Sequence, residues 1–318
     1  MIVVLTIALL GQVSMEEFMV FHALLIAATV HSKQGSMLWP ATNKGSKRIK
    51  TLAPPVDFGA YMKEWRFKEI KYILPKIMED PSKAENDDWY KMRRRMEQFH
   101  LTTKNTMFVS SVCCFDESMS AFIPRTTKTG GLPNLSFIAR KPEPLGTELK
   151  VVADGLTGKF IWMEIQEGKE RMQSKQFQSL GSTAACTLRG VVYSREYQYL
   201  PVVPDADATD TIECDRKRLW LGDSWFGSVK TVANIGKMGQ HACMIIKTAH
   251  TRSPKKFFEG KMADFPGGTW IVMEGRAEKE EVDLVCVGYK YNKRKVLTFV
   301  LTKVAGKFEE CLQIFFYN

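Results

Sequence analysis

The chain has 318 residues, of which 45% are hydrophobic and 25% charged, and its formal net charge is +10. This composition excludes an intrinsically disordered chain, and the length allows two domains with room for a subdomain insertion. The basic excess favours an acidic partner, of which nucleic acid is the commonest.

Seven cysteines and five histidines show no zinc-ligand spacing. A metal site in this chain would therefore be built from oxygen ligands, which suit Mg²⁺ or Mn²⁺. The odd number of cysteines and the absence of a CxxC pair indicate reduced thiols in an intracellular protein.

The amino-terminal part predicts helices. Residues 2–10 are apolar but too few to span a membrane, and no basic residue precedes them, so we favour a packed segment or an atypical gene start over a secretion signal. Ser14 and Glu17 form a capping box, which predicts a helix ending between His31 and Gly35. A second helix is predicted over Tyr61 to Met78.

A third helix begins at Trp89 and is strongly basic, with Arg93, Arg94 and Arg95 in its first turns. A solvated helix face and a phosphate-contacting surface explain this cluster equally well. The first 105 residues thus predict a helical N-terminal domain.

From Phe108 the pattern changes to strands. An apolar run from Met107 to Phe115 predicts a buried strand that ends at Asp116 and Glu117. A carboxylate at such a position is costly unless a cation compensates it, and a metal ion is the usual compensator. The more frequent alternative is a turn former or a helix cap.

A second buried strand, Leu219 to Gly222, ends in Asp223. The elements predicted around it are strands over 149–153 and 159–165 joined by a turn at Asp154, a helix over 172–180, a loop up to 218, a helix over 228–238 stopped by Gly239, and a strand over 242–247. This order of elements, a three-stranded meander followed by a helix, a strand, a helix and a strand, is that of ribonuclease-H-like domains. In that order the first strand lies beside the fourth. That adjacency predicts that the carboxylates of Asp116 and Asp223 share a cation, roughly 4 to 7 Å apart.

The fold class expected is therefore α/β. A ribonuclease-H-like mixed sheet core with helices is predicted over 106–250. A helical domain over 1–105 precedes it, and an incomplete β-hairpin insertion region over 251–318 follows it.

Several motifs together resemble the transposase domain of piggyBac elements and their domesticated relatives. Around its first catalytic Asp the family has Asp-Glu, four residues, Phe, two residues and Arg, and this chain has Asp116-Glu117, Phe122 and Arg125. Around the second, the family pattern Asp-Asn-x-Phe-Thr-Ser corresponds to residues 223–228. Further matches at the family's intervals are Lys141-Pro142, Gly146, Asp154 and Gly168-Lys169. The resemblance covers roughly residues 14 to 303, and its specificity lies in the whole set.

The sequence also departs from the family pattern. Ser224 and Gly227 replace the usual Asn and Thr, and Glu148 stands where a Lys is common. The third family Asp lies in a Gly-Gly-Val-Asp segment, and this chain stops at Asn318 before any such segment. The resemblance therefore predicts a transposase core that is truncated at its C-terminus and catalytically impaired. The alternative is a non-catalytic domesticated DNA-binding protein.

The chemistry that the resemblance implies is phosphodiester hydrolysis and strand transfer with two Mg²⁺ (or Mn²⁺) ions. One ion would activate the attacking water or 3′-hydroxyl, and the other would stabilise the leaving oxygen. Asp116 and Asp223 would be the catalytic metal ligands, and Glu117 is a weaker metal candidate.

The partner implied is DNA, as transposon ends and target, in the nucleus, with a homodimer as one assembly and no membrane contact. Residues expected to meet phosphates are Arg125, Lys128, Arg140, Lys141 and Lys169, together with Arg93, Arg94 and Arg95. For any single one of them, ordinary surface charge is the alternative.

Overall fold

The structure is a computed structural model, and it describes residues 13–30, 38–39, 57–73, 87, 89–121, 134–139, 144–199, 217–247 and 253–303. The chain divides into two compact units, Met1–Asp87 and Asp88–Asn318. The predictions for residues 2–10 and for Arg125, Lys128, Arg140 and Lys141 lie outside the described residues. Within those residues, no helix is long and apolar enough to cross a membrane.

The first unit contains the helices α2 (Met15–Val30) and α3 (Glu64–Ile73) and the short 3-10 helix η2 (Phe58–Ala60). The hydroxyl of Ser14 accepts the N–H of Glu17 at 3.1 Å, so the predicted start of the first helix is confirmed. The two α-helices are joined by an ion pair in which the guanidinium of Arg66 donates to both oxygens of Glu17. The core of this unit contains Phe21, Leu24, Trp39, Phe58, Phe67 and Ile70.

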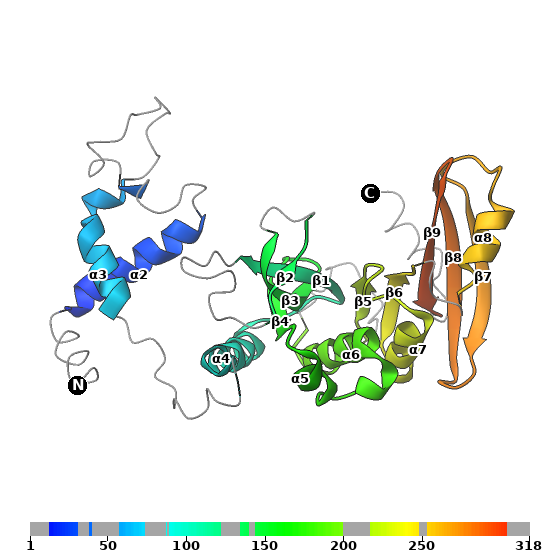
Figure 1. Cartoon of the computed structure of the whole chain (residues 1–318), viewed down its shortest axis with the longest axis horizontal. Coiled ribbons are helices and arrows are strands. Elements are labelled where there is room, and N and C mark those ends of the chain that lie inside the picture. Colours follow the sequence, from blue (N-terminus) through cyan, green and yellow to red (C-terminus); the bar gives the residue numbers. More distant parts are fainter. Residues whose placement is uncertain are drawn as a thin grey trace, which may run out of the picture. The chain divides into compact units, whose positions relative to one another are not determined.

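The second unit is built around one mixed sheet (Figure 1). Its helices are α4 (Tyr90–Thr106), α5 (Lys169–Gln173), the 3-10 helix η4 (Gln178–Leu180), α6 (Ser182–Ser194), α7 (Val229–Lys237) and α8 (Lys255–Lys261). Its strands are β1 (Val112–Ala121), β2 (Ser136–Phe137), β3 (Leu145–Asp154), β4 (Phe160–Ile165), β5 (Leu219–Gly222), β6 (His241–Ile245), β7 (Trp270–Ala277), β8 (Val282–Asn292) and β9 (Lys295–Thr302).

The nine strands that the structure describes follow the order β2-β3-β1-β5-β6-β9-β8-β7, and β4 also pairs with β3. Strand β5 runs parallel to both of its neighbours, β1 and β6, and the other pairs are antiparallel. The predicted meander is therefore confirmed as β1, β3 and β4, and the predicted adjacency of strands one and four is confirmed as the β1–β5 pair. This is a mixed α/β fold with the ribonuclease-H-like strand order in its core.

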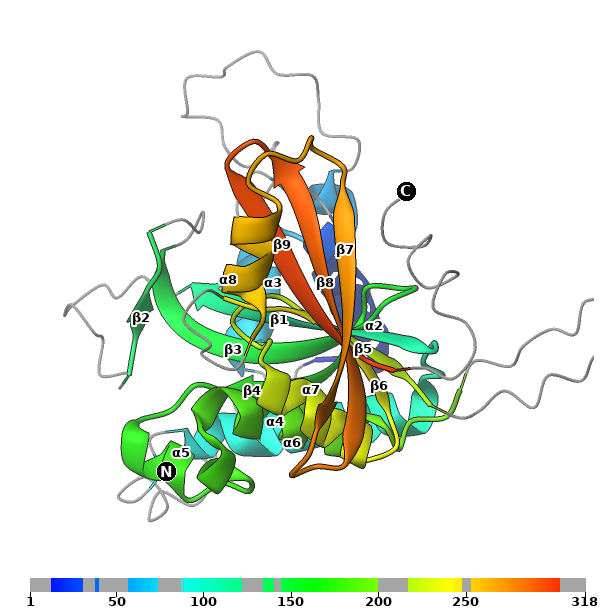
Figure 2. The same cartoon turned by 90° about the vertical axis from the view of Figure 1, so that its right-hand side faces the viewer.

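Helices α6 and α7 cover one face of the central strands (Figures 1 and 2). The main core lies between these helices and the side chains of Phe115, Val152, Trp220 and Met244. The helix–sheet contact is tight, because a Cβ added at Gly190 of α6 would lie 2.6 Å from Cε1 of Phe115. Gly190 thus allows α6 to approach β1 closely.

Two of the predicted element boundaries are wrong. Strand β1 begins at Val112 and continues to Ala121, because its hydrogen-bonded pairing with β3 extends past the two carboxylates. Asp116 therefore lies within the strand and not at its end. Helix α6 occupies part of the segment predicted to be loop, because a helix of mainly small residues such as Ala184, Ala185 and Cys186 shows little of the usual large-residue periodicity.

The predicted helix over 172–180 is also split, into α5 and η4, and Phe177 between them has a φ of 66°. In contrast, Gly239 has a φ of 73° and follows the end of α7, as the sequence predicts.

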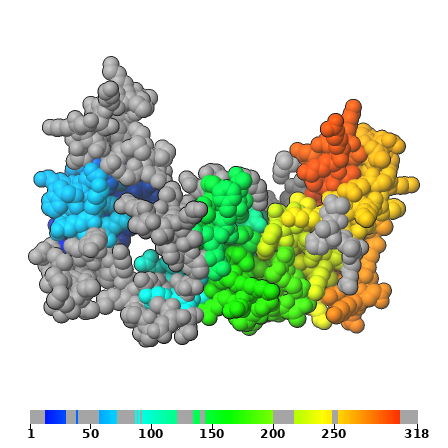
Figure 3. Space-filling model, in the orientation of Figure 1, coloured from blue at the N-terminus to red at the C-terminus, as the bar shows by residue number. Residues whose placement is uncertain are grey.

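The domain boundaries differ from those predicted at 105 and 250. Helix α4 belongs to the second unit, because it packs on β4 and its His100 accepts the N–H of Met163 at 3.0 Å. The strands β7–β9 extend the same sheet, because β9 pairs with β6. Figure 3 shows the surface of this unit, where the central strands and helices (green to yellow) lie next to β7–β9 (orange to red).

Candidate metal-binding carboxylate site

Asp116 and Asp223 lie at equivalent positions on neighbouring parallel strands. In the β1–β5 pair Phe115 is the register partner of Gly222, and each aspartate is the next residue of its strand or of the turn that follows. Phe115 faces the core beneath α6, so Asp116 projects to the other face of the sheet, and both aspartates are exposed. The register thus places the two predicted aspartates at neighbouring backbone positions of adjacent strands.

Backbone N–H groups orient both carboxylates. Oδ1 of Asp116 accepts the N–H of Glu117 at 2.7 Å, and Oδ1 of Asp223 accepts the N–H of Trp225 at 2.8 Å. In each carboxylate this backbone N–H contacts Oδ1 and leaves Oδ2 unoccupied. These contacts limit the rotation of the carboxylates before anything binds to them.

The turn after β5 connects Asp223 to helix α7. The carbonyl of Asp223 accepts the N–H of Gly227 at 2.9 Å, and Ser228 caps the helix by accepting the N–H of Thr231 at 3.0 Å. Phe226 is buried in the core against Phe115, with ring centroids 5.4 Å apart. Asp223 is therefore held between a buried strand and a capped helix.

Glu117 lies on the opposite face of β1 from Asp116. Its carboxylate is buried, and Oε1 lies 3.2 Å from Nζ of Lys150, its register partner on β3. Nζ of Lys150 is also 2.6 Å from Oε1 of Glu148 and 3.2 Å from the ring centroid of Trp225. The structure therefore brings Glu117 to Lys150 and not to the aspartate pair.

The residues of the aspartate pair fit a hard divalent cation. Both supply carboxylate oxygens, the ligands that Mg²⁺ and Mn²⁺ prefer, and Mg²⁺ is commonly held by one or two carboxylates. In the described part of the chain neither forms an ion pair with a lysine or arginine. No cluster of three or more His, Cys, Asp or Glu side chains that could hold a metal occurs among the described residues.

The basic candidates lie elsewhere on the second unit. Arg93 of α4 forms an ion pair with the buried carboxylate of Glu167, just before α5, so Arg93 has a structural partner. This contact also brings the first turns of α4 next to α5, where Arg94, Arg95 and Lys169 are exposed. Since α4 also contacts α6 through His100 and Tyr193, this basic surface is on the helix-covered side of the sheet, whereas Asp116 projects from the other face.

Buried polar contacts hold the starts of β1 and β5. Arg218, fully buried just before β5, donates to the carbonyls of Ser110 at 3.2 Å and of Arg195 and Tyr197 at 2.8 Å each. Asp154 accepts the N–H groups of Ser110 and Thr157. Burial alone would raise the pKa of Asp154, but these hydrogen bonds outweigh burial and lower it below its ordinary value.

Lys150, Trp225 and Arg218 are residues that sequence reasoning missed. A lysine next to an apolar run such as 151–153 of β3 is a signal for a buried ion pair, because a buried ammonium needs a partner. The sequence alone does not tell which carboxylate supplies it.

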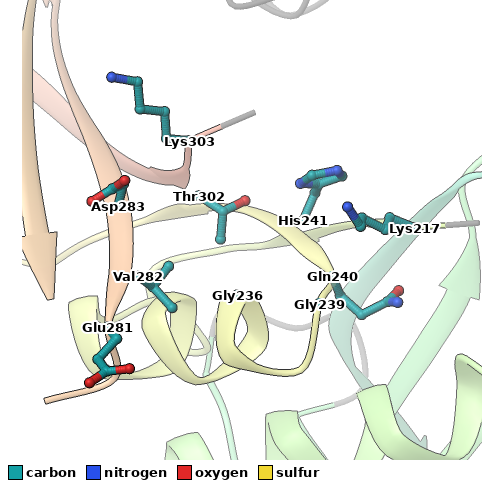
Figure 4. A pocket seen from close by; sticks show the side chains of 10 residues that line it. All are labelled: Lys217, Gly236, Gly239, Gln240, His241, Glu281, Val282, Asp283, Thr302 and Lys303. Atoms are coloured by element: carbon teal, nitrogen blue, oxygen red, sulfur yellow. The ribbon is translucent and has the colours of Figure 1, made fainter. Parts of the chain in front are cut away.

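A pocket of about 420 Å³ lies at the other end of the parallel strands (Figure 4). Lys217, at the start of β5, and His241, at the start of β6, line one side, and Asp283 and Lys303 line the opposite side. Asp223 follows the opposite end of β5, so this pocket is separate from the carboxylate site.

Comparison with known proteins identifies a family. A family model described as Transposase IS4 matches residues 8–189, more than half of the chain. The match includes Asp116, and Asp223 lies beyond it. No curated protein matches the sequence.

Among solved structures, the fold is similar to a cryo-EM structure of the piggyBac transposase synaptic complex with hairpin DNA, with a TM-score of 0.63 and 17% sequence identity. The similarity covers 95% of this chain and 56% of that one, so this chain spans little more than half the length of that transposase.

Proposed function

Since this chain belongs to the piggyBac-type transposase family, whose model is described as Transposase IS4, we propose that it is a DNA-binding protein with a divalent-metal site at Asp116 and Asp223. The observation that carries this proposal is the placement of the two aspartates directly after the register partners Phe115 and Gly222 on parallel strands. The ancestral activity is metal-dependent cleavage and transfer of DNA strands.

The two carboxylates would hold the cation through the oxygens that the backbone N–H groups of Glu117 and Trp225 do not occupy. A divalent cation bound there would stabilise negative charge on the oxygens of a phosphodiester. Mg²⁺ and Mn²⁺ are the ions we propose. Glu117, neutralised by Lys150 on the opposite face, is not among the ligands of this proposal.

DNA is the proposed partner, with transposon ends and target as its forms, and the nucleus is the proposed compartment. The net charge of +10 supports binding to a polyanion. Exposed Arg94, Arg95 and Lys169 are the described candidates for phosphate contact. Arg125, Lys128, Arg140 and Lys141 stay candidates on sequence grounds, and a homodimer is the proposed assembly.

We further propose that these 318 residues cleave DNA poorly. The proposed site has two carboxylates, Asp116 and Asp223, whereas a two-ion site needs a further ligand to fix the second ion against the scissile phosphate. Misplacement by about 1 Å can cost on the order of 10²-fold in rate. The second candidate function, DNA binding without cleavage, follows from the same observation.

A nicking assay separates the two candidates. Supercoiled plasmid carrying candidate transposon ends is incubated with the purified chain and Mg²⁺ or Mn²⁺, beside Asp223→Ala. We expect no nicking above that of the variant. Metal-dependent nicking that Asp223→Ala abolishes would contradict the proposed impairment and would mean that another acid completes the site.

DNA binding is tested by filter retention across a salt series. We expect retention at low salt that falls steeply as salt is added, because phosphate contacts release counterions. Absence of retention at low salt, or retention indifferent to salt, would contradict the proposed DNA partner.

A further inference from the structure

A buried lysine contacts the residue next to Asp116 and a residue of the turn that follows Asp223. The side chain of Lys150 is only 1% exposed and extends from β3, which carries neither aspartate. Its ammonium is 3.2 Å from Oε1 of Glu117 and 2.6 Å from Oε1 of Glu148. Two acceptor carboxylates compensate the cost of burying this charge and fix its position.

The same ammonium lies over an aromatic ring of the turn that carries Asp223. Nζ of Lys150 is 3.2 Å from the ring centroid of Trp225 and 5.5 Å from that of Phe226. A cation within about 6 Å of a tryptophan face is attracted by the electron-rich ring, most strongly when both are desolvated. Lys150 therefore holds Trp225 against β3.

The residues that Lys150 contacts are also those that orient the aspartates. The N–H of Glu117 donates to Asp116 at 2.7 Å, and the N–H of Trp225 donates to Asp223 at 2.8 Å. One buried cation thus contacts the side chain of both residues whose backbone holds a carboxylate. Asp116 lies on β1 and Asp223 follows β5, and their shared neighbour comes from a third strand.

We propose that Lys150 is a positioning residue that sets the placement of Asp223 relative to Asp116, through its contacts with Trp225 and Glu117. The inference rests on the proposed function, since it assumes that the two aspartates share a divalent cation. Partners that orient metal ligands typically change metal affinity by about 10- to 100-fold when they are removed. Removing the contacts of Lys150 is expected to lower the metal affinity by a factor in this range, although Lys150 touches no side chain that binds the metal.

The test uses Mn²⁺ alone, with the free ion counted by electron paramagnetic resonance as the full chain is titrated. Trp225→Leu removes the ring without leaving a buried charge, and is expected to weaken Mn²⁺ binding by about 10-fold. Trp225→Phe keeps an aromatic face and should restore most of the affinity. Trp270→Leu, at a half-exposed tryptophan of β7, is the matched control and should bind as the unchanged chain does.

A second variant guards against loss of the fold. Lys150→Met combined with Glu117→Gln and Glu148→Gln removes all three charges and keeps similar side-chain volumes. It is expected to unfold at a temperature close to that of the unchanged chain and to bind Mn²⁺ as weakly as Trp225→Leu. Affinity that falls while the unfolding temperature holds distinguishes positioning from a purely structural role.

Asp223→Asn separates failure of the inference from failure of the proposed function. If Asp223→Asn loses Mn²⁺ binding while Trp225→Leu and the triple variant bind as the unchanged chain does, Lys150 has no positioning role. If Asp223→Asn binds Mn²⁺ normally, or the unchanged chain does not bind it, the metal site and this inference are both overturned.

Discussion

The backbone of Gly227 lies so close to Ile245 that a Cβ added at Gly227 would stand 1.9 Å from the carbonyl oxygen of Ile245. The obstacle is backbone of β6, which cannot rotate away as a side chain can. At this position the family pattern has a threonine, so the departure seen in the sequence is matched by the packing of this chain. The turn that carries Asp223 thus fits closely against β6.

Gly227→Ala is therefore expected to destabilise the second unit strongly. Ordinary overpacking costs about 1–3 kcal/mol, and we expect a loss at or above the top of that range because backbone must move. Urea unfolding measures this loss in the free energy of unfolding. Gly260→Ala, in α8 with open space around its Cα, is the control and should be neutral or slightly stabilising. Equal stability of both variants would show that the turn is not packed as described.

Arg218 is expected to be essential for stability. Its guanidinium donates to four backbone carbonyls next to β1 and at the end of α6, and Arg218→Met would remove this donor from buried and part-buried acceptors. We expect the free energy of unfolding to fall by about 3 kcal/mol. Lys237→Met, at an exposed lysine of α7, should change it by less than about 0.5 kcal/mol. A small effect for Arg218→Met would mean that water or other donors satisfy the carbonyls.

Stability should depend on pH through His100. Burial lowers the pKa of His100 below its ordinary 6.5, and Nε2 accepts the N–H of Met163, which only a neutral ring can do. Between the lowered folded pKa and 6.5 the unfolded chain binds more protons, so the stabilising contribution is complete above 6.5 and is lost as the pH falls towards the folded pKa.

His100→Gln, whose amide oxygen can still accept, should remove this part of the pH dependence. Thermal unfolding between pH 7 and about pH 5 measures it, above the range near pH 4 where carboxylates titrate. An unchanged slope in His100→Gln would assign the dependence to another group.

The arginines of α4 should separate into two roles. Arg93→Met breaks the ion pair with buried Glu167 and should lower the free energy of unfolding by about 1–3 kcal/mol. Arg94→Ser combined with Arg95→Ser should leave stability unchanged and reduce the salt slope of DNA binding by about 0.9 for each phosphate that these arginines neutralise. Unchanged DNA binding in the double variant would assign these arginines to a solvated surface.

The sequence predicts the order of the central strands better than it predicts their boundaries. Asp116 and Asp223 are identified because a carboxylate after a buried strand is costly, and the strand order then makes them neighbours. The extent of β1 past Asp116 could not be predicted, because it depends on hydrogen bonds to β3, a strand some 30 residues away in the chain.

The missed features share a physical cause. Helix α6 is recognisable only from its fit to the sheet, since Gly190 and its alanines give a weak local signal. The roles of Lys150 and Arg93 depend on partners distant in sequence, Glu117 and Glu167, and composition does not pair them. Charge counts therefore predict a basic protein, but they do not predict which basic residues already form ion pairs within the fold.

The most direct test of the central claim is an anomalous diffraction map from crystals of the chain soaked in Mn²⁺. We predict one peak bridging Asp116 and Asp223, with carboxylate oxygens of both at about 2.1 Å, near the value for Mg²⁺. Loss of the peak in Asp223→Asn crystals would complete the assignment. A peak on other residues, or two carboxylates that point apart with no ion between them, would contradict the account.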